Sequence, residues 1–156
     1  MPKAPFSSSD KEGFQLVQPA TAADWDSYFE LRWRVLREPW QQPRGSERDD
    51  SDASGYHLMI KDGQGKAVAV GRLHFNSPEE AQVRYMAVSP EWRRRGVGGR
   101  ILLGLEGFAR RQGAQRVVLN AREDAIRFYQ GHGCRILGPA ETLFGQVRHV
   151  RMGKEL

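Results

Sequence analysis

The sequence predicts an α/β fold, a mixed and mostly antiparallel twisted sheet flanked by helices. Three strand patterns follow one another with short turns between them, at residues 56–61, 67–75 and 82–89. Apolar residues then recur at helical spacing from Val97 to Phe108. A short apolar strand at 116–120 follows, which makes a β-α-β crossover. The 156 residues suffice for one ordinary core, so we expect a flexible tail at 1–12 and a single domain at 13–156.

The N-terminal elements have clear local signals. Residues 14–18 alternate apolar and polar side chains, as a half-buried strand does. Thr21 and Asp24 form a pair like a capping box at the start of a helix. Pro39 and Pro43 end that helix. The polar loop at 38–54 is long for a compact domain, which is typical of functional or disordered segments.

The remaining elements follow the crossover. Gly113 is a natural end for the helix that begins near Val97. A second helix is expected at 123–130, ended by glycines 131 and 133, and closing strands at 134–137 and 146–152. The complete order is therefore β-α-loop-β-β-β-α-β-α-β-β.

Charge is distributed unevenly along a chain whose net charge is +5 and whose pI is about 9.7. An excess of positive charge favours an anionic partner: nucleic acid, a membrane surface or a phosphorylated cofactor. Four arginines crowd one stretch and five acidic residues crowd the loop. We expect a positive pocket for an anionic cofactor and an acidic loop facing a cationic substrate. These residues are Arg93, Arg94, Arg95 and Arg100, and Glu38, Glu47, Asp49, Asp50 and Asp52.

The sequence gives no sign of a membrane or disulfide protein. Its apolar runs fall short of the ~18 residues that cross a bilayer, and residues 1–13 have no apolar signal segment. Cys134 is the single cysteine, which excludes an internal disulfide and a cysteine-rich metal site. It is either a small buried group or a nucleophile, and its apolar neighbours favour the first. We expect a cytoplasmic protein with no metal and no membrane partner.

Residues 88–102 (VSPEWRRRGVGGRIL) carry the strongest functional signal. A strand leads through a proline turn into glycines that open a helix, where unsatisfied N–H groups and the helix dipole bind anions. The glycines let a phosphate approach the backbone, and the arginines add charge. A Walker A loop would need Lys and Ser or Thr after Gly99. A dinucleotide fingerprint would need a small residue where Ile101 stands. Solvated arginines at an ordinary helix start remain the alternative.

Two motifs resolve this choice. Arg93-x-x-Gly96-x-Gly98, after Met86-Ala87-Val88-Ser89-Pro90, resembles motif A of the GNAT superfamily of N-acetyltransferases. Asn120 and the run AIRFYQGHG at 125–133 resemble motif B. The resemblance covers about residues 13–156. The stretches at 31–50, 119–129 and 144–152 are similar to a bacterial branch that includes ElaA-like proteins.

The resemblance implies a V-shaped splay between the motif A strand and its parallel neighbour, with acetyl-CoA as the donor and no metal. The backbone of the motif A strand would bind the pantetheine arm, and the following turn would bind the pyrophosphate. Asn120 would contact the pantetheine or anchor the next helix, Phe128 would lie beside the cofactor or in the core, and Tyr129 would act as the acid toward the leaving thiolate. The strand residues are Met86, Ala87 and Val88, and those of the turn are Arg93, Arg94, Arg95, Gly96, Val97, Gly98 and Gly99.

The resemblance also implies direct attack by a primary amine within a ternary complex. The general base is undetermined, because Gln82 stands where some members have Glu. His74, His149 or a water chain remain as candidates. Arg84 either clamps an anionic group of the acceptor or faces solvent.

Two other functions compete with catalysis. One is a module that binds acyl-CoA without turnover, which Gln82 favours and Tyr129 opposes. The other is nucleic-acid binding through the arginines, but the aromatic pattern of RNA-binding domains and a DNA-reading motif are missing. We therefore expect acetyl-CoA and an unnamed amine, of a small molecule or a protein, as partners, and no nucleic acid. A homodimer is a further expectation, because dimers are common among GNAT proteins.

Overall fold

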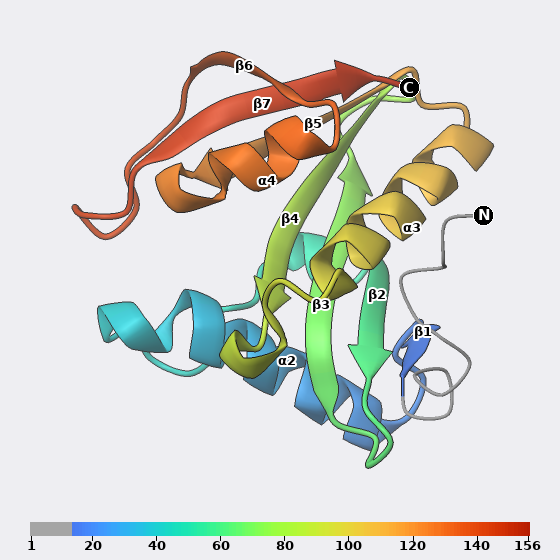
Figure 1. Cartoon of the computed structure of the whole chain (residues 1–156), viewed down its shortest axis with the longest axis vertical. Coiled ribbons are helices and arrows are strands. Elements are labelled where there is room, and N and C mark those ends of the chain that lie inside the picture. The colour runs from blue at the N-terminus through green and yellow to red at the C-terminus, as the bar shows by residue number, and fades with distance from the viewer. Residues whose placement is uncertain (1–13) are drawn as a thin grey trace. The chain divides into compact units, whose positions relative to one another are not determined.

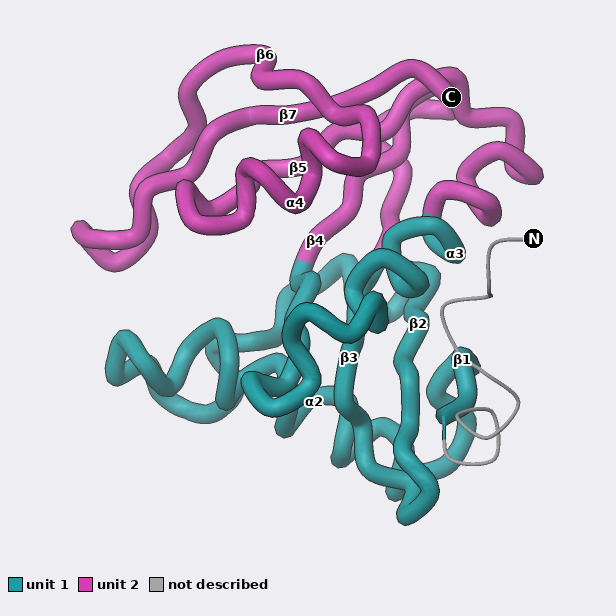
Figure 2. Tube along the Cα trace, in the orientation of Figure 1, with its two compact units in different colours: residues 1–72, 85–105 teal, residues 73–84, 106–156 magenta. Residues whose placement is uncertain are grey.

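The computed structural model describes residues 14–156, so the tail expected at 1–12 lies outside the described residues. The chain divides into two compact units (Figure 2). The described part of the first unit comprises 14–72 and 85–105, and the second comprises 73–84 and 106–156.

The described residues contain the expected elements in the expected order (Figure 1). Their strands form one sheet in the order β1-β2-β3-β4-β5-β7-β6. The strands β4 and β5 are parallel, while β5–β7 and β6–β7 are antiparallel, which confirms the mixed α/β class. The strands are β1 (Gln15–Val17), β2 (Tyr56–Lys61), β3 (Ala67–Phe75), β4 (Glu80–Val88), β5 (Arg116–Arg122), β6 (Arg135–Pro139) and β7 (His149–Glu155). The α-helices are α2 (Ala22–Leu36), α3 (Val97–Arg111) and α4 (Ile126–Gly131).

Helix α2 begins as its sequence predicts. The Thr21 side chain accepts a hydrogen bond from the Asp24 N–H, and the Asp24 carboxylate accepts one from the Thr21 N–H, so the capping box is complete. The helix ends at Leu36, and Pro39 lies in the short 3₁₀ helix η1 (Glu38–Trp40). The capping prediction is therefore confirmed.

The first unit has a core on each face of its strands. Tyr28, Leu31 and Val35 of α2 pack in one cluster with Met59 of β2, Ala67 and Val70 of β3, and Ala87 of β4. Alternate strand residues turn the other way, because side chains of a strand point to opposite faces. A Cβ built on Gly71 would meet Ile101 of α3 at 2.6 Å, and one on Gly104 would meet Leu58 at 2.7 Å. Helix α3 therefore approaches the face opposite to α2, and glycine is needed where it comes closest.

The second unit is organised around β5. Its parallel ladder with β4 runs from Glu80↔Arg116 to Val83↔Leu119. Its antiparallel ladder with β7 runs from Arg116↔Glu155 to Arg122↔His149. The splay expected beyond the β4–β5 ladder involves residues of both units and stays a prediction.

Two sequence predictions need correction. The helix expected at 123–130 begins as a 3₁₀ turn, η4 (Glu123–Ala125), before α4. The closing strands lie at Arg135–Pro139 and His149–Glu155 rather than at 134–137 and 146–152. A turn takes the place of the first predicted residues: Phe144 and Gly145 have positive φ, and Leu143 and Val147 form an isolated bridge. Apolar and polar residues alternate through this turn as they do in β7, so the alternation could not show that the strand begins at His149.

No helix within residues 14–156 is long and apolar enough to span a bilayer.

Candidate active site

The turn between β4 and α3 has the geometry expected for an anion site. Arg94 and Gly96 have positive φ values of 63° and 81°, so the backbone curls tightly before Val97 starts the helix. The Arg100 N–H donates to the Gly96 carbonyl at 3.1 Å. The N–H groups before Arg100 lie in the first helical turn, where the helix offers them no carbonyl to bond. These groups and the positive end of a 15-residue helix dipole fit a pyrophosphate.

The arginines of this turn are exposed. Arg93, Arg94 and Arg95 are exposed to solvent, and the Arg95 guanidinium lies 4.4 Å from the centroid of the Trp92 ring. Val97 is instead buried at 1% exposure, which anchors the helix start in the first unit. The turn therefore presents exposed cationic side chains next to a buried helix start, an arrangement that suits a phosphorylated ligand.

The β4 segment just before this turn contains a feature that the sequence did not predict. Tyr85 has φ of 57°, in the left-handed region that aromatic residues rarely adopt. Met86 and Val88 are half-buried, and Ala87 is buried at 3% exposure. The strand therefore changes direction at the residue before the segment that was expected to bind pantetheine.

A buried ion-pair cluster surrounds Tyr85, and no pattern in the sequence indicates it. Arg32 of α2 and Arg72 of β3 are both 0% exposed. Arg32 donates to Asp52 at 2.9 Å, and Arg72 donates to Asp52 at 2.9 Å and to both carboxylate oxygens of Asp49. An arginine inside a helix or strand pattern gives no sign of its partner when that partner lies about twenty residues away.

This cluster changes the interpretation of the acidic loop. Glu47 is 4% exposed and accepts hydrogen bonds from the Gly45 N–H and from Arg48. Asp49 and Asp52 neutralise the buried arginines, while Asp50 is exposed. Glu47 is therefore buried, and Asp49 and Asp52 are paired with arginines inside the protein, while a role of the loop toward a cationic substrate stays a prediction.

A buried tyrosine–histidine pair extends the cluster. The His57 Nε2 lies 2.9 Å from the Asp52 carbonyl, which can only accept, so Nε2 carries the proton. The Nδ1 atom is then the acceptor, 2.7 Å from the Tyr28 hydroxyl. Burial lowers the pKa of His57 and raises the pKa of Tyr28 to about 12, so both groups are neutral at pH 7. For Asp52, burial opposes ionisation, but the Arg32 charge and several hydrogen bonds outweigh it and lower the pKa.

The predicted motif B residues lie in the second unit. Tyr129 is buried at 7% exposure, and burial, with a smaller contribution from Cys134, raises the pKa of its hydroxyl. The half-buried Phe128 ring lies edge-on to Tyr129 with centroids 5.0 Å apart. Asn120 is exposed on β5, and its side-chain oxygen accepts a hydrogen bond from Arg151 at 3.3 Å. Tyr129 is thus a fully protonated phenol at neutral pH, as a proton donor must be.

The candidates for the general base have defined hydrogen bonds. The Gln82 oxygen accepts from Asn76 at 2.9 Å, and an amide cannot take up a proton at neutral pH. The Nε2 of His74 lies 3.2 Å from the Asn76 oxygen. The Nδ1 of His149 lies 2.9 Å from the Val147 carbonyl, which can only accept, so Nδ1 carries a proton and donates it there. Arg84 is half-buried on β4.

Cys134 lies in a setting that does not activate a thiol. It is 5% exposed, and burial together with the Glu106 carboxylate raises its pKa. Glu106 is itself 0% exposed and pairs with Lys154 at 2.8 Å. The structural role expected for this cysteine agrees with its surroundings. Within residues 14–156, no group of three or more His, Cys, Asp or Glu side chains is arranged to hold a metal ion.

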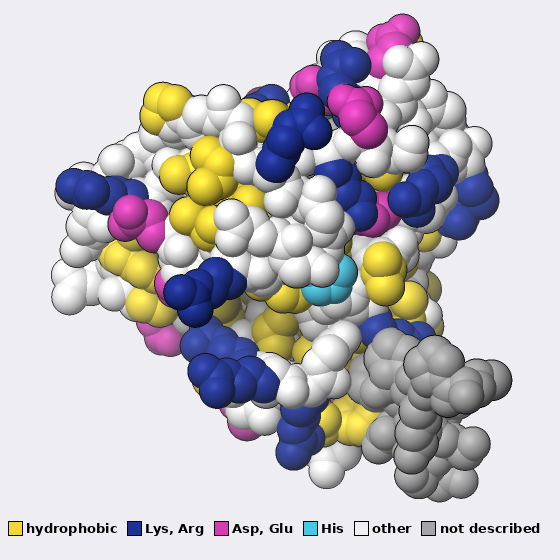
Figure 3. Space-filling view, turned by 45° about the horizontal axis from the view of Figure 1, so that its top comes forward, with side chains coloured by type: hydrophobic (Ala, Val, Ile, Leu, Met, Phe, Trp, Pro, Cys, Tyr) yellow, Lys and Arg dark blue, Asp and Glu magenta, His cyan; other side chains and the backbone are white. Residues whose placement is uncertain are grey.

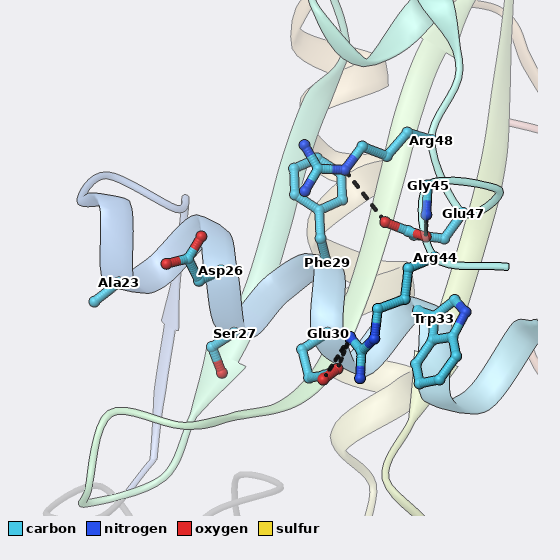
Figure 4. A pocket seen from close by; sticks show the side chains of 10 residues that line it. All are labelled: Ala23, Asp26, Ser27, Phe29, Glu30, Trp33, Arg44, Gly45, Glu47 and Arg48. Carbon is cyan, nitrogen blue, oxygen red and sulfur yellow. Dashed lines mark hydrogen bonds and ion pairs between the residues drawn. The ribbon is translucent and has the colours of Figure 1, made fainter. Parts of the chain in front are cut away.

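A separate open hollow lies along α2 and the following loop (Figure 4). Arg44 donates two hydrogen bonds to Glu30 and lies 3.9 Å from the centroid of the Trp33 ring. Arg48 lies 3.9 Å from the Phe29 ring centroid. None of the residues predicted for the site from sequence lines this hollow, apart from Glu47 of the acidic loop.

On the face shown in Figure 3, several Lys and Arg side chains lie close together toward the lower left of the view, and others lie apart from them. Lys and Arg side chains lie there in several groups, separated by hydrophobic, acidic and uncharged groups.

Comparisons with known proteins agree with the geometry. Residues 25–134 match the family model described as "Acetyltransferase (GNAT) family". The chain is 32% identical over 127 residues to a Bacillus subtilis protein named "Uncharacterized N-acetyltransferase YjcF", covering 81% of this chain and 89% of that one. The crystal structure of Escherichia coli ElaA is similar with a TM-score of 0.74 and 20% identity, over 91% of this chain and 98% of ElaA. An aminoglycoside 6'-N-acetyltransferase solved with coenzyme A gives a TM-score of 0.74 and 14% identity, over 91% of this chain and 96% of that chain.

Proposed function

Because this chain belongs to the GNAT family of acetyl-CoA-dependent N-acetyltransferases, we propose that it acetylates a primary amine by direct attack in a ternary complex. The observation that carries the proposal is the backbone turn at Arg94 and Gly96, which leads into the N-terminus of α3. This turn fits the pyrophosphate of a coenzyme A ester, and the neighbour solved with coenzyme A supports that ligand.

The first unit binds and orients the donor in this proposal. The N–H groups of Val97, Gly98 and Gly99 and the side chains of Arg93, Arg94 and Arg95 hold the pyrophosphate. The main chain of Met86, Ala87 and Val88 holds the pantetheine arm, and a strand N–H faces the thioester oxygen. Acetyl-CoA supplies an acyl group activated as a thioester. In the second unit, Asn120 and Phe128 are the proposed contacts for the pantetheine arm.

Tyr129 is the proposed general acid. Its raised pKa keeps the hydroxyl protonated, so it can donate a hydrogen bond that stabilises the departing thiolate, whose pKa near ~8.5 makes complete transfer of the proton from the phenol unfavourable. Replacing Tyr129 with Phe keeps the ring that packs against Phe128. We expect kcat to fall by about 10²–10⁴-fold with little change in acetyl-CoA affinity. If the variant melts at a lower temperature but turns over at the wild-type rate, Tyr129 is a packing residue.

The acceptor amine must lose a proton before attack, since an alkylamine has a pKa near ~10. His149 and His74 are the proposed side-chain bases, with a water chain as the alternative, and Arg84 is the proposed contact for an anionic group of the acceptor. The hydrogen bond from His149 Nδ1 to the Val147 carbonyl supports His149 as the base, because in the neutral ring the lone pair that a base needs is then on Nε2.

The decisive experiment is a screen of amines that measures coenzyme A release from acetyl-CoA. It includes polyamines, amino acids, aminoglycosides and peptides with free N-termini or lysines. Transfer to one amine class supports the proposal. Tight binding of acetyl-CoA without transfer to any class would favour a module that binds acyl-CoA without turnover. We also propose a cytoplasmic location, which the buried free thiol of Cys134 supports. A homodimer is proposed from the family alone, and light scattering of the purified chain tests it.

A further inference from the structure

Three arginines surround the ring of Tyr85. The guanidinium carbons of Arg32, Arg72 and Arg37 lie 4.2, 5.0 and 5.5 Å from its centroid. Arg32 and Arg37 come from α2 and its C-cap, and Arg72 comes from β3, so two segments distant in the sequence converge on one side chain. Guanidinium groups at this distance attract the face of an aromatic ring, and the attraction grows when water is excluded.

The arginines are themselves fixed in place. Arg32 and Arg72 are 0% exposed, and Arg37 is 8% exposed. Asp52 accepts hydrogen bonds from both Arg32 and Arg72, and Asp49 accepts from Arg72 and lies 3.4 Å from the Tyr85 hydroxyl. Arg37 donates to the Ser46 and Leu36 carbonyls at 3.0 Å. Buried guanidinium groups with this many partners cannot reorient without leaving charge unpaired.

The backbone at Tyr85 needs such a restraint. Its φ of 57° costs energy for an aromatic residue, and glycine or asparagine would adopt it more readily. Such a conformation persists only where surrounding contacts determine it. The next residue is Met86, the first of the proposed pantetheine-binding segment.

The same cluster reaches Met86 by a second route. The Tyr28 hydroxyl accepts from Arg32 at 3.0 Å, donates its proton to His57 and lies 3.2 Å from the Gly71 carbonyl. A Cβ on Gly71 would lie 2.7 Å from the Met86 sulfur, so the Met86 side chain packs directly on this glycine. The cluster therefore contacts both the residue before Met86 and the strand that supports it.

We infer that Arg32, Arg72 and Arg37 are positioning residues that clamp the Tyr85 ring and so set the main chain of 86–88 for the pantetheine arm. This inference rests on the proposed function, because it assigns a purpose to the segment that the proposed donor site uses. The alternative is a cluster that stabilises the fold alone.

Two ligands separate these roles. Coenzyme A has both the pyrophosphate and the pantetheine arm, whereas adenosine 3'-phosphate 5'-diphosphate has only the nucleotide and pyrophosphate. The turn at 93–99 binds what the two ligands share, and only coenzyme A reaches residues 86–88. The ratio of their dissociation constants therefore reports the geometry of 86–88 separately from overall stability.

The first variants act on Tyr85. Tyr85→Leu removes the ring, and we expect coenzyme A to bind about tenfold more weakly, the equivalent of one or two backbone hydrogen bonds, with the smaller ligand changed by less than about twofold. Tyr85→Phe keeps the ring and should bind both ligands as the wild type does. Tyr85→Gly relieves the backbone strain but has no ring, and we expect it to resemble Tyr85→Leu.

The next pair acts on the arginines. Arg72→Lys keeps the charge but loses the planar group that faces the Tyr85 ring and bridges two carboxylates. It should weaken the binding of coenzyme A more than the binding of the smaller ligand. Arg44→Lys is the matched control, because Arg44 also stacks on an aromatic ring and bonds a carboxylate through two hydrogen bonds, but it is exposed and does not contact Tyr85. If Arg72→Lys fails to fold, the Tyr85 series decides alone.

Amide hydrogen exchange of the ligand-free protein provides an independent measurement. Exchange at 86–88 should accelerate in Tyr85→Leu and Arg72→Lys relative to exchange in α2, and stay unchanged in Arg44→Lys. The inference is overturned if the variants lose affinity for both ligands in the same proportion, or if Tyr85→Gly has the wild-type ratio of dissociation constants. It is also overturned if amide exchange at 86–88 does not change. If the wild-type protein binds neither ligand, the proposed function is wrong. The exchange experiment then still tests whether the arginines and Tyr85 hold the main chain of 86–88.

Discussion

Two groups of arginines in the first unit show how the same side chain serves opposite purposes. Arg93, Arg94 and Arg95 stand exposed on the turn before α3. Arg32 and Arg72 are completely buried, and Asp49 and Asp52 neutralise them. The exposed group keeps its charge available for a ligand, while the charge of the buried group is used within the fold.

This difference indicates which part of the chain carries unneutralised positive charge, since the net charge is +5. The acidic residues of the loop at 38–54 do not neutralise the positive charge of the turn at 93–95, because most of them form ion pairs with buried or neighbouring arginines. The turn therefore keeps a local positive potential beside the helix N-terminus. Stability should accordingly depend on the buried arginines, and ligand affinity on the exposed ones.

The largest effect is expected at a buried arginine. Replacing Arg72 with Met leaves Asp49 without its main partner and Asp52 with only Arg32, which should lower the free energy of unfolding by about 3–5 kcal/mol. The matched variant Arg94→Met, on the exposed turn, should change it by less than about 0.5 kcal/mol. Urea unfolding of both variants measures the difference. Equal losses in the two would contradict the separation.

The next effect concerns the ligand alone. Acetyl-CoA at about a hundredfold excess over its dissociation constant should stabilise the wild type by ~2.7 kcal/mol. Gly98→Asp puts a side chain and a negative charge at the helix start, so this stabilisation should be lost. Gly107→Asp, in the same helix but nine residues further along, should keep it. Thermal melts with and without acetyl-CoA compare the two, and Gly99→Asp replaces Gly98→Asp if the latter does not fold. An unchanged shift in a folded Gly98→Asp variant would refute the phosphate assignment.

A smaller effect is expected for each exposed arginine. Arg94→Ser should weaken acetyl-CoA binding by about 1 kcal/mol, or roughly fivefold in Kd, because it removes one charge-assisted contact at a solvated site. The loss should shrink at high salt, which screens exposed charges. Titrations at low and high ionic strength test this. A loss independent of salt would mean that Arg94 acts through the shape of the turn rather than its charge.

The smallest effect is on the pH dependence of stability. The folded-state pKa of His57 is lowered by burial, so unfolded chains take up a proton that the folded chain does not. The resulting stability is complete above the unfolded pKa of about 6.5 and declines as the pH falls toward the folded pKa. The His57→Gln variant should show a flatter stability profile over this range, measured by urea midpoints at several pH values. A profile parallel to that of the wild type would show that His57 does not titrate on unfolding.

Much of the fold follows from short-range patterns. The capping box of Thr21 and Asp24, the strands at 56–61 and 67–75, and the helix start at Val97 depend on residues within about one helical turn or one strand. Gly96, which we expected to let a phosphate approach the backbone, has a φ of 81°, a conformation that glycine adopts without strain. Such features are encoded where they occur, and the sequence alone determined them, together with the family that the two motifs indicate.

The buried cluster was decided only by the tertiary structure. Arg32 and Asp52 are twenty positions apart, and Arg72 and Asp49 are twenty-three apart, so no local pattern identifies them as partners. An arginine on a helix and an aspartate in a loop are ordinary surface residues until the chain brings them together away from water. The left-handed backbone of Tyr85 is equally invisible in the sequence, because an aromatic residue does not favour it. It exists because contacts from segments distant in the sequence outweigh the local preference, and a sum over distant contacts is what only the folded chain provides.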